Sequence, residues 1–389
     1  MSNTITNLYN DAFAALEVVS REQIGMIPAV MMDAQANRVV IGQTIRFPIA
    51  PAATASTISA GLYAPDTGDQ TIGNDTLSID QLYKCPFRWE GGEQALLNQG
   101  PGYMSVNQQQ IAQAMRTLVN QIENDLCDLS IKASRAVSSS GTNLFDATDK
   151  LQSLANAVKI LDDNGAPFDR HLVIGTTEVA RMRALTQLTN VNEAGEQSFL
   201  RQGQLADLFG AKVHQSAQIY TPTAGTADAS TDTDSSAYAV GDTVITLGTS
   251  GTGAIKAGDV IVFSTDTTNK YVVASGDADV SGGGTITLAA PGIRKALPAT
   301  ATTIAVENRA AEIRHNILFD RSAIMLATRL PHDPVDGDAA TKKIVVQDPR
   351  SGLAFEIRAY PQYHRTYYEV CIAWGVKAVK PAHIALMVD

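Results

Sequence analysis

Residues 105–136 read SVNQQQIAQAMRTLVNQIENDLCDLSIKASRA, and this stretch decides the fold. Its large apolar residues recur at steps of three or four positions, which is the spacing of one helical face. They are Ile111, Met115, Leu118, Ile122, Leu126 and Leu129. The pattern predicts one helix of about 30 residues, roughly 45 Å long, capped by Ser105 or Asn107. A coiled coil would need an apolar residue where Asp125 stands, so we expect the helix to lie against a sheet.

The segments before this helix include a terminal helix and a strand. Residues 5–20 predict a short amphipathic helix whose apolar face contains Leu8, Phe13 and Leu16. Such a helix is marginal alone, so we expect it to dock on another surface. Val39–Phe47 then predicts a strand.

Residues 49–86 form an unusual stretch that is rich in Ala, Thr, Ser, Gly and Asp. Within it, Thr57–Tyr63 and Thr76–Tyr83 are expected to pair as strands across the turn residues 65–69. A two-stranded arm without an apolar face is not stable by itself. We therefore expect this arm to lie across a partner surface, from its own chain or from a neighbouring one.

After the long helix the pattern changes twice. Helices are expected at 151–161, 177–188 and 199–209, with strands at 171–175 and 212–220, which together predict a mixed α/β segment. Residues 221–292 are then crowded with Thr, Gly, Ser, Ala and Asp, and the helical periodicity disappears. Short apolar runs predict strands at 243–247, 259–264, 271–274, 285–289 and 302–306. We expect a small, partly open β-barrel domain, entered by a flexible linker at Pro222–Ser236 and inserted into a host domain that resumes near Ile313.

The composition limits the classes of protein to which this chain can belong. The 389 residues suggest two or three domains, and 44% hydrophobic with 18% charged residues argues against intrinsic disorder. The net charge of −10 disfavours a general binder of the nucleic-acid backbone. Three widely spaced cysteines indicate neither a disulfide scaffold nor a zinc ribbon. No signal peptide or apolar run of membrane-spanning length is recognisable, so we expect a cytoplasm-like compartment and no membrane.

The chain carries no recognisable catalytic motif, phosphate loop or metal-binding motif. The best metal-like cluster is residues 332–338, HDPVDGD, for which a solvated loop is the preferred interpretation. The carboxylate pairs Asp125/Asp128 and Asp162/Asp163 are interpreted as surface charge, and Cys127 as a packing thiol. Trp89 and Trp374 are interpreted as core or contact aromatics. We expect no catalytic residue, cofactor or metal.

The order of these segments resembles that of the major capsid (coat) proteins of tailed phages, which share the Hong Kong 97-type fold. More specifically it resembles the coat type of short-tailed phages with an inserted β-barrel domain. The likeness rests on the terminal helix, the extended loop, the long helix and the broken α/β segment, together with Phe319–Ala327, which is similar to the strand after the insertion. It also rests on Cys371–Ala385, where an apolar strand, a basic residue, Pro, Ala and a final apolar strand follow one another.

The resemblance implies an α+β fold in six segments: 1–48 as N-terminal arm and first strand, 49–86 as extended loop, 87–145 as peripheral domain with the spine helix, 146–220 as axial α/β domain, 221–312 as inserted β domain, and 313–389 as the return of the axial and peripheral domains. It implies a protein without enzymatic activity that assembles with itself into pentamers and hexamers of an icosahedral shell around double-stranded DNA. Further implied partners are a scaffolding protein, a portal protein and host chaperones. The location would be the virion, assembled in the bacterial host cytoplasm.

We predict that the contacts between subunits involve the terminal helix, the arm and the entry to the insertion. The residues are Leu8, Phe13, Leu16, Thr57, Leu62, Tyr63, Asp66, Asp69, Asp228, Asp232 and Asp234. In relatives a loop of the insertion forms salt bridges to the next capsomer, whereas Thr223–Tyr238 here offers three aspartates and no cation. Two other functions stay open at this point: a two-domain surface- or carbohydrate-binding protein that uses the β module, and a hydrolase built on the α/β part.

Overall fold

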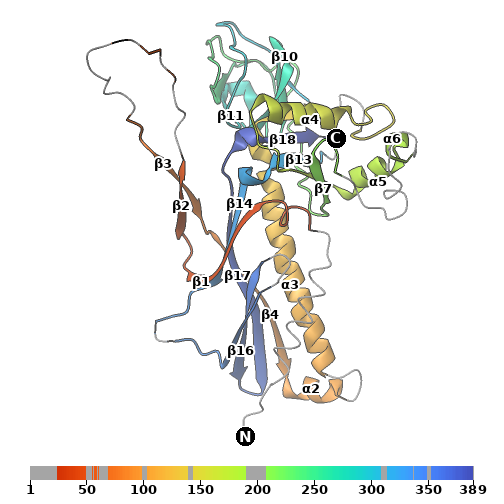
Figure 1. The fold of residues 1–389 in the computed structure, drawn as a ribbon, viewed down its shortest axis with the longest axis vertical. Coiled ribbons are helices and arrows are strands. Elements are labelled where there is room, and N and C mark those ends of the chain that lie inside the picture. The colour runs from red at the N-terminus through yellow and green to blue at the C-terminus, as the bar shows by residue number, and fades with distance from the viewer. Residues whose placement is uncertain are drawn as a thin grey trace.

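The computed structural model describes residues 24–49, 55, 57–58, 60, 69–98, 103–138, 143–189, 207–307, 313–335, 337–347 and 352–388. The molecule is elongated, with one long helix running along much of its length (Figure 1). A six-stranded sheet flanks one end of this helix, a ten-stranded sheet with short helices forms the other end, and a two-stranded hairpin projects sideways. These mixed layers confirm an α+β architecture. In the described ranges no helix has the length and apolar character that crossing a membrane requires.

The long helix is α3 (Tyr103–Asp128), about 39 Å in length. Its apolar stripe is buried against the sheets, which confirms the predicted packing of a helix on a sheet: Ile111, Met115, Leu118, Ile122 and Leu126 are all at most 2% exposed. The predicted extension to Ala136 is wrong. A 3₁₀ turn, η1 (Leu129–Lys132), follows the helix, and β5 (Arg135–Ser138) then pairs in parallel with β18 (Ile384–Val388). Pairing with a strand some 250 residues away overrides the local helical periodicity.

The six-stranded sheet is organised around β17 (Arg365–Ala378). Along one edge β17 pairs with β14 (Ile324–Pro331) and β16 (Ala354–Gln362), and along the other with β4 (Gln81–Glu90). The remaining strands are β1 (Met31–Val39), which is parallel to β14, and β15 (Lys342–Gln347), while α2 (Gly91–Leu97) follows β4. The predicted ending is confirmed, because β17 is followed by the turn η4 (Pro381–His383) and β18.

The ten-stranded sheet has the order β12-β9-β10-β5-β18-β13-β6-β7, with β11 and β8 attached through β10. Its remaining strands are β6 (Arg170–Ile174), β7 (Ala211–Gln215), β8 (Val244–Leu247), β9 (Val260–Phe263), β10 (Asp266–Ser275), β11 (Gly284–Leu288), β12 (Ile304–Val306) and β13 (His315–Asp320). The flanking helices are α4 (Gln152–Asp163), α5 (Thr176–Ala184) and α6 (Thr186–Thr189), and a short turn η2 (Val280–Gly282) precedes β11.

Several predicted elements differ in detail. The helix at 151–161 is confirmed as α4 and ends before Gly165, whose φ of +69° suits glycine. The helix expected at 177–188 is divided in two at Leu185, and the strand expected at 212–220 is only β7. Of the helix expected at 199–209, residues 199–206 lie outside the described residues, and 207–209 are not helical. The strand expected at Phe319–Ala327 is interrupted by the turn η3 (Arg321–Ala323).

All five strands expected in the β insertion are present, as β8 to β12. Residues 222–236 are not a flexible linker, however. Their backbone pairs with the insertion, since Thr226 N–H donates to Ala254 O at 2.8 Å and Thr233 N–H to Thr302 O at 2.9 Å. The ends of the insertion meet as expected, because His315 N–H donates to Tyr220 O. Where the chain divides into domains stays a prediction.

The insertion is also joined to the rest of the molecule, which the sequence did not indicate. Lys270 of β10 pairs with Ala136 of β5, so one sheet runs from the insertion into the host. Val260 and Val272 pack in the main core rather than in the core of the insertion, and Val244 is 53% exposed. The strands of the insertion therefore contact the host as well as one another.

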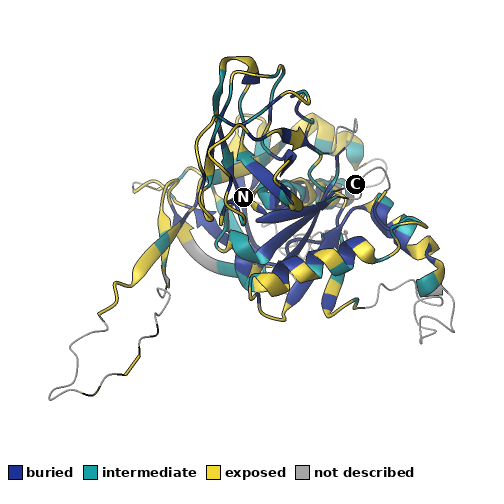
Figure 2. Cartoon of the chain, turned by 90° about the horizontal axis from the view of Figure 1, so that it is seen from above, coloured by how far each residue is buried: buried dark blue, intermediate teal, exposed yellow. Residues whose placement is uncertain are grey.

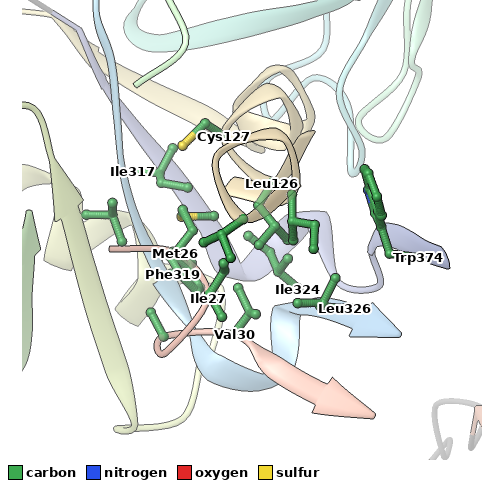
Figure 3. Packing of buried hydrophobic residues seen from close by; sticks show 14 of the residues in the cluster. Met26, Ile27, Val30, Leu126, Cys127, Ile317, Phe319, Ile324, Leu326 and Trp374 are labelled. Carbon is green, nitrogen blue, oxygen red and sulfur yellow. The ribbon is translucent and has the colours of Figure 1, made fainter. Parts of the chain in front are cut away.

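The main core lies where α3 meets the two sheets. Figure 3 shows side chains of α3, of the segment 26–30 and of β13, β14 and β17 converging there. Cys127 is buried in this cluster, which confirms a packing thiol, and Trp374 is fully buried, as expected of a core aromatic. A second core lies under α4 and α5, and a third fills the insertion.

Candidate functional site

A hairpin of β2 (Thr44–Ile49) and β3 (Gly73–Ser78) projects from the body of the molecule (Figures 1 and 2). The two strands and the residues between them in the sequence are called the arm below. The predicted pairing of Thr57–Tyr63 with Thr76–Tyr83 is wrong. Thr76 instead pairs with Arg46, and the predicted strand Val39–Phe47 is divided by a turn in which Gly42 has φ +88°. The short β strands of the arm are separated by more than 20 residues, so turn chemistry near residue 67 did not determine their register.

In its described residues, the arm is anchored to the body of the molecule at its base. Val39, Leu77 and Ile79 form a small buried cluster with Ala327 and Ala373 of the six-stranded sheet. Beside it, Lys377 of β17 forms an ion pair with Asp75, and its Nζ donates to Thr76 O at 2.8 Å. The hydrogen bond from Lys377 lowers the pKa of Asp75.

Beyond this base the described residues of the arm are solvent-exposed. Ile58 and Ile72 are large apolar residues with most of their surface in solvent. Of the predicted contact residues, Thr57 and Asp69 are exposed, whereas Leu62, Tyr63 and Asp66 lie outside the described residues. The arm was predicted to lack an apolar face, whereas these two isoleucines expose apolar surface on it.

The N-terminal contact residues Leu8, Phe13 and Leu16 also lie outside the described residues. What the structure describes is where that segment joins the body. Glu123 of α3 is 1% exposed, and its carboxylate accepts hydrogen bonds from the backbone N–H groups of Gly25, Met26 and Ile27 at 2.7, 2.7 and 3.1 Å. Burial raises the pKa of Glu123. These three hydrogen bonds hold the backbone of residues 25–27 against α3.

Each of the three aspartates at the entry to the insertion interacts with another residue of the insertion. Asp228 accepts from Ser230 N–H and Thr252 Oγ1–H, both at 3.1 Å. Asp234 accepts from Tyr238 O–H at 2.5 Å, which lowers the pKa of Asp234. Asp232 forms an isolated bridge with Thr303 through the backbone. Asp228 and Asp234 thus shape turns of the insertion, and a role of these three residues between subunits stays a prediction.

The metal-like cluster at 332–338 is largely a solvated loop, as predicted, because four of its described residues are exposed, but two of its aspartates are held by cations. Asp333 contacts Arg38 and Lys343 at 3.0 and 3.1 Å, and Asp338 contacts Arg358 at 3.1 Å. A buried carboxylate, Glu356, receives hydrogen bonds from both arginines at 2.7 Å. The loop is therefore tied down by cations from β1, β15 and β16, and no metal-binding group of three or more side chains occurs in the described ranges.

The paired carboxylates on the helices also have structural partners. Asp125 is not simply a surface charge, because Trp374 Nε1–H donates to its Oδ2 at 2.7 Å and so links α3 to β17. Asp162 and Asp163 form ion pairs with Arg170 and Arg135 at 2.6 and 3.1 Å. In both pairs at least one carboxylate therefore joins its helix to another element.

Searches with family models and of curated proteins return no match. Solved structures do match over nearly the whole chain. A chain of the capsid of the cyanophage P-SCSP1u has TM-score 0.50 and 13% identity, with 92% of this chain and 86% of that chain covered. The chain has the fold of a phage capsid protein. Matches at lower TM-scores include a chain of Mycobacterium phage Che8 (0.46, 13% identity, 91% and 92% covered) and one of the capsid of a native GTA particle (0.48, 11% identity, 95% and 90% covered).

Within this capsid fold, the anchoring residues are the ones that sequence reasoning missed. Glu123 follows Val119 by one helical turn and precedes Cys127 by another, and both neighbours are buried. A carboxylate in the middle of such a stripe was the available signal. Lys377 and Arg358 gave no comparable signal, since alternating charged residues are ordinary in strands with one solvated face.

Proposed function

We propose that this protein is a major capsid protein of the Hong Kong 97 type. Copies assemble into pentamers and hexamers of an icosahedral shell that encloses double-stranded DNA. The observation that carries the proposal is the match in fold to a phage capsid chain over 92% of this chain. The acidic net charge fits a shell that tolerates packaged DNA without gripping it. The protein would act in the virion after assembly in the bacterial cytoplasm, with a scaffolding protein and a portal protein as partners and without enzymatic activity.

The arm supplies the second argument for assembly. A two-stranded sheet is marginal in water, and this one has apolar support only at its base. Exposed large side chains such as Ile58 gain free energy when a neighbouring subunit covers them. We therefore assign the arm, with Thr57, Leu62, Tyr63, Asp66 and Asp69, to a contact between subunits. The terminal residues Leu8, Phe13 and Leu16 are assigned to a second contact, made once assembly is under way.

Electron microscopy of the purified protein tests the proposal. We expect closed shells or tubes of capsomers, and small monodisperse particles would favour a monomeric binding protein instead. Ile58→Asp should prevent shells while leaving the melting temperature of the subunit unchanged, because Ile58 contacts nothing that a folded subunit needs. Val335→Asp is the matched control, since Val335 is also almost fully exposed but lies far from the arm in the sequence. Equal loss of shells in both variants would remove the argument for the arm.

A further inference from the structure

A cavity of about 250 Å³ lies where α4, β5 and β10 meet, at the junction of the insertion and its host. Its charged lining residues are Arg135 from β5, Lys159 from α4 and Lys270 from β10, and no Asp or Glu is among the described residues that line it. The chain as a whole has 40 acidic and 30 basic residues, so a lining with three cations and no acid is opposite to its composition. The other lining residues are four with neutral hydrogen-bonding side chains, Ser138, Asn156, Thr268 and Asn269, and three apolar ones, Ala136, Val137 and Ile160.

Two of the cations are held in place by groups around the cavity. Arg135 is 7% exposed, and its Nη1 donates to Asn269 Oδ1 at 3.0 Å while its Nη2 donates to Asp163 Oδ2 at 3.1 Å. Lys270 forms an ion pair with Glu307 and donates to Ser138 O at 3.2 Å. Both side chains are therefore oriented before any ligand arrives, which reduces the entropy lost on binding.

One donor of this group is unsatisfied. Arg135 Nε is buried and has no hydrogen-bond acceptor among the described residues. A buried N–H group without an acceptor costs free energy, so an acceptor supplied from outside would stabilise the site. Lys159, whose side chain is 68% exposed, adds an ammonium group 3.7 Å from Asp163.

We propose that this cavity binds a phosphate group. Arg135 pairs with Asp163 and Lys270 with Glu307, so the cation least occupied by a carboxylate is Lys159, whose Nζ lies 3.7 Å from Asp163. The groups that can still donate are Arg135 Nε, the Lys159 ammonium and the side chains of Asn156 and Thr268, which come from three elements. Such a mixed set of N–H and O–H donors suits an oxyanion with several acceptor oxygens. The cations of the lining argue against a metal cation as the ligand. The phosphate group comes either from free phosphate or from the backbone of DNA.

Titration of the unassembled, full-length subunit with inorganic phosphate tests the site, followed by calorimetry or by ³¹P NMR. We expect saturable binding that is weakened about tenfold by Lys159→Gln, because one charge-assisted hydrogen bond is lost. Lys212→Gln is the matched control, since Lys212 is similarly exposed and ion-paired but lies on β7, outside the cavity. Its phosphate affinity should equal that of the wild type. Absence of saturable binding to the wild type, or equal affinity of both variants, would overturn the proposal.

A short DNA duplex distinguishes the two sources. If the duplex displaces phosphate and Lys159→Gln weakens both ligands, the site takes the DNA backbone. If phosphate binds and the duplex does not compete, the site takes free phosphate. Because binding is measured before assembly, a failure here leaves the proposed shell function standing, and failure to form shells leaves the binding result standing.

Discussion

At the scale of single residues, buried polar groups join segments that are far apart in the chain. Glu123 is the clearest case, because one carboxylate receives three backbone N–H groups and lies on the buried side of α3. A buried carboxylate is tolerated only when its oxygens are satisfied. The segment that donates these hydrogen bonds, residues 25–27, lies near the start of the described residues and shortly before β1.

Replacing Glu123 with Gln should therefore destabilise the subunit. The amide keeps the volume but loses a charged acceptor and presents its own N–H₂ group to backbone donors. We expect the free energy of unfolding to fall by roughly 1.5–3 kcal/mol, measured by urea denaturation. Asp80→Asn is the control, because it removes an exposed carboxylate and should change stability little. A loss no larger than in the control would mean that the three hydrogen bonds contribute little.

A second residue-scale prediction concerns pH. His171 Nδ1 and His214 Nε2 lie 2.9 Å apart between β6 and β7, and burial lowers the pKa of His214 to about 4. The charged groups facing the pair are Asp169, Lys212, Asp207 and Arg321. In the unfolded chain a histidine titrates near pH 6.5, so between about pH 6.5 and 4 the unfolded state takes up a proton that the folded state refuses. The free energy of unfolding therefore decreases as the pH falls through that window.

The measurement is the free energy of unfolding of the wild type and of His214→Gln at several pH values from 7 to 4. The variant should lose less stability on acidification than the wild type does. His332→Gln serves as the control, because His332 is exposed. Parallel pH profiles for the wild type and His214→Gln would contradict the prediction.

At the scale of elements, the arm and the long helix follow different rules. Helix α3 buries a stripe that runs from Ile111 to Cys127 and is stabilised by this packing. The arm has a six-residue pairing of β2 with β3, a small apolar base and the contact of Lys377 with Asp75. Few described contacts therefore fix the position of the arm, which suits a part that adapts to a neighbour.

Lys377→Ala should loosen the arm without unfolding the body. Both partners of this ion pair are partly exposed, so its contribution is at most about 1 kcal/mol. That corresponds to an increase of up to roughly fivefold in hydrogen exchange of the amides of β2 and β3, measured by mass spectrometry. Lys84→Ala removes another exposed lysine of the same sheet, ion-paired with Glu369, and should leave arm exchange unchanged. Faster exchange throughout the six-stranded sheet would contradict the prediction, because it would mean that Lys377 stabilises the whole sheet.

At the scale of the whole molecule, the insertion and the host share a sheet and a core. Strand β10 lies between β9 of the insertion and β5 of the host, and Val260 and Val272 pack in the main cluster. A fragment of residues 221–312 would expose these side chains. The composition of the insertion suggests a module that folds by itself. The contacts that it shares with the host indicate instead that the insertion and the host unfold together.

We therefore expect one unfolding transition for the subunit. Ile286→Ala in the insertion and Ile317→Ala in the host each remove a fully buried side chain, which costs roughly 2–5 kcal/mol. Both variants should lower the midpoint of the same calorimetric transition. An early, separate transition in Ile286→Ala, with the host transition unshifted, would show that the insertion folds by itself.

The sequence determined those features of this protein that follow from local periodicity and turn chemistry. These are the apolar stripe of α3, the helix α4 with its terminal glycine, the strands β8 to β12 and the ending of strand, proline turn and strand. They are readable because each depends on residues within about a turn or a strand of one another. Together with the order of segments, they were enough to indicate the capsid fold.

Only the tertiary structure decided which strands pair, where α3 ends and which polar groups meet. Residues 129–136 continue a helical pattern but leave the helix because β5 is completed by β18 and β10. Glu123 and the backbone of residues 25–27, Asp125 and Trp374, and Lys377 and Asp75 are about 100 to 300 positions apart. The sequence around one partner can show that it is unusual, as for Glu123, but it cannot show which distant residue it meets, because the fold brings the two together.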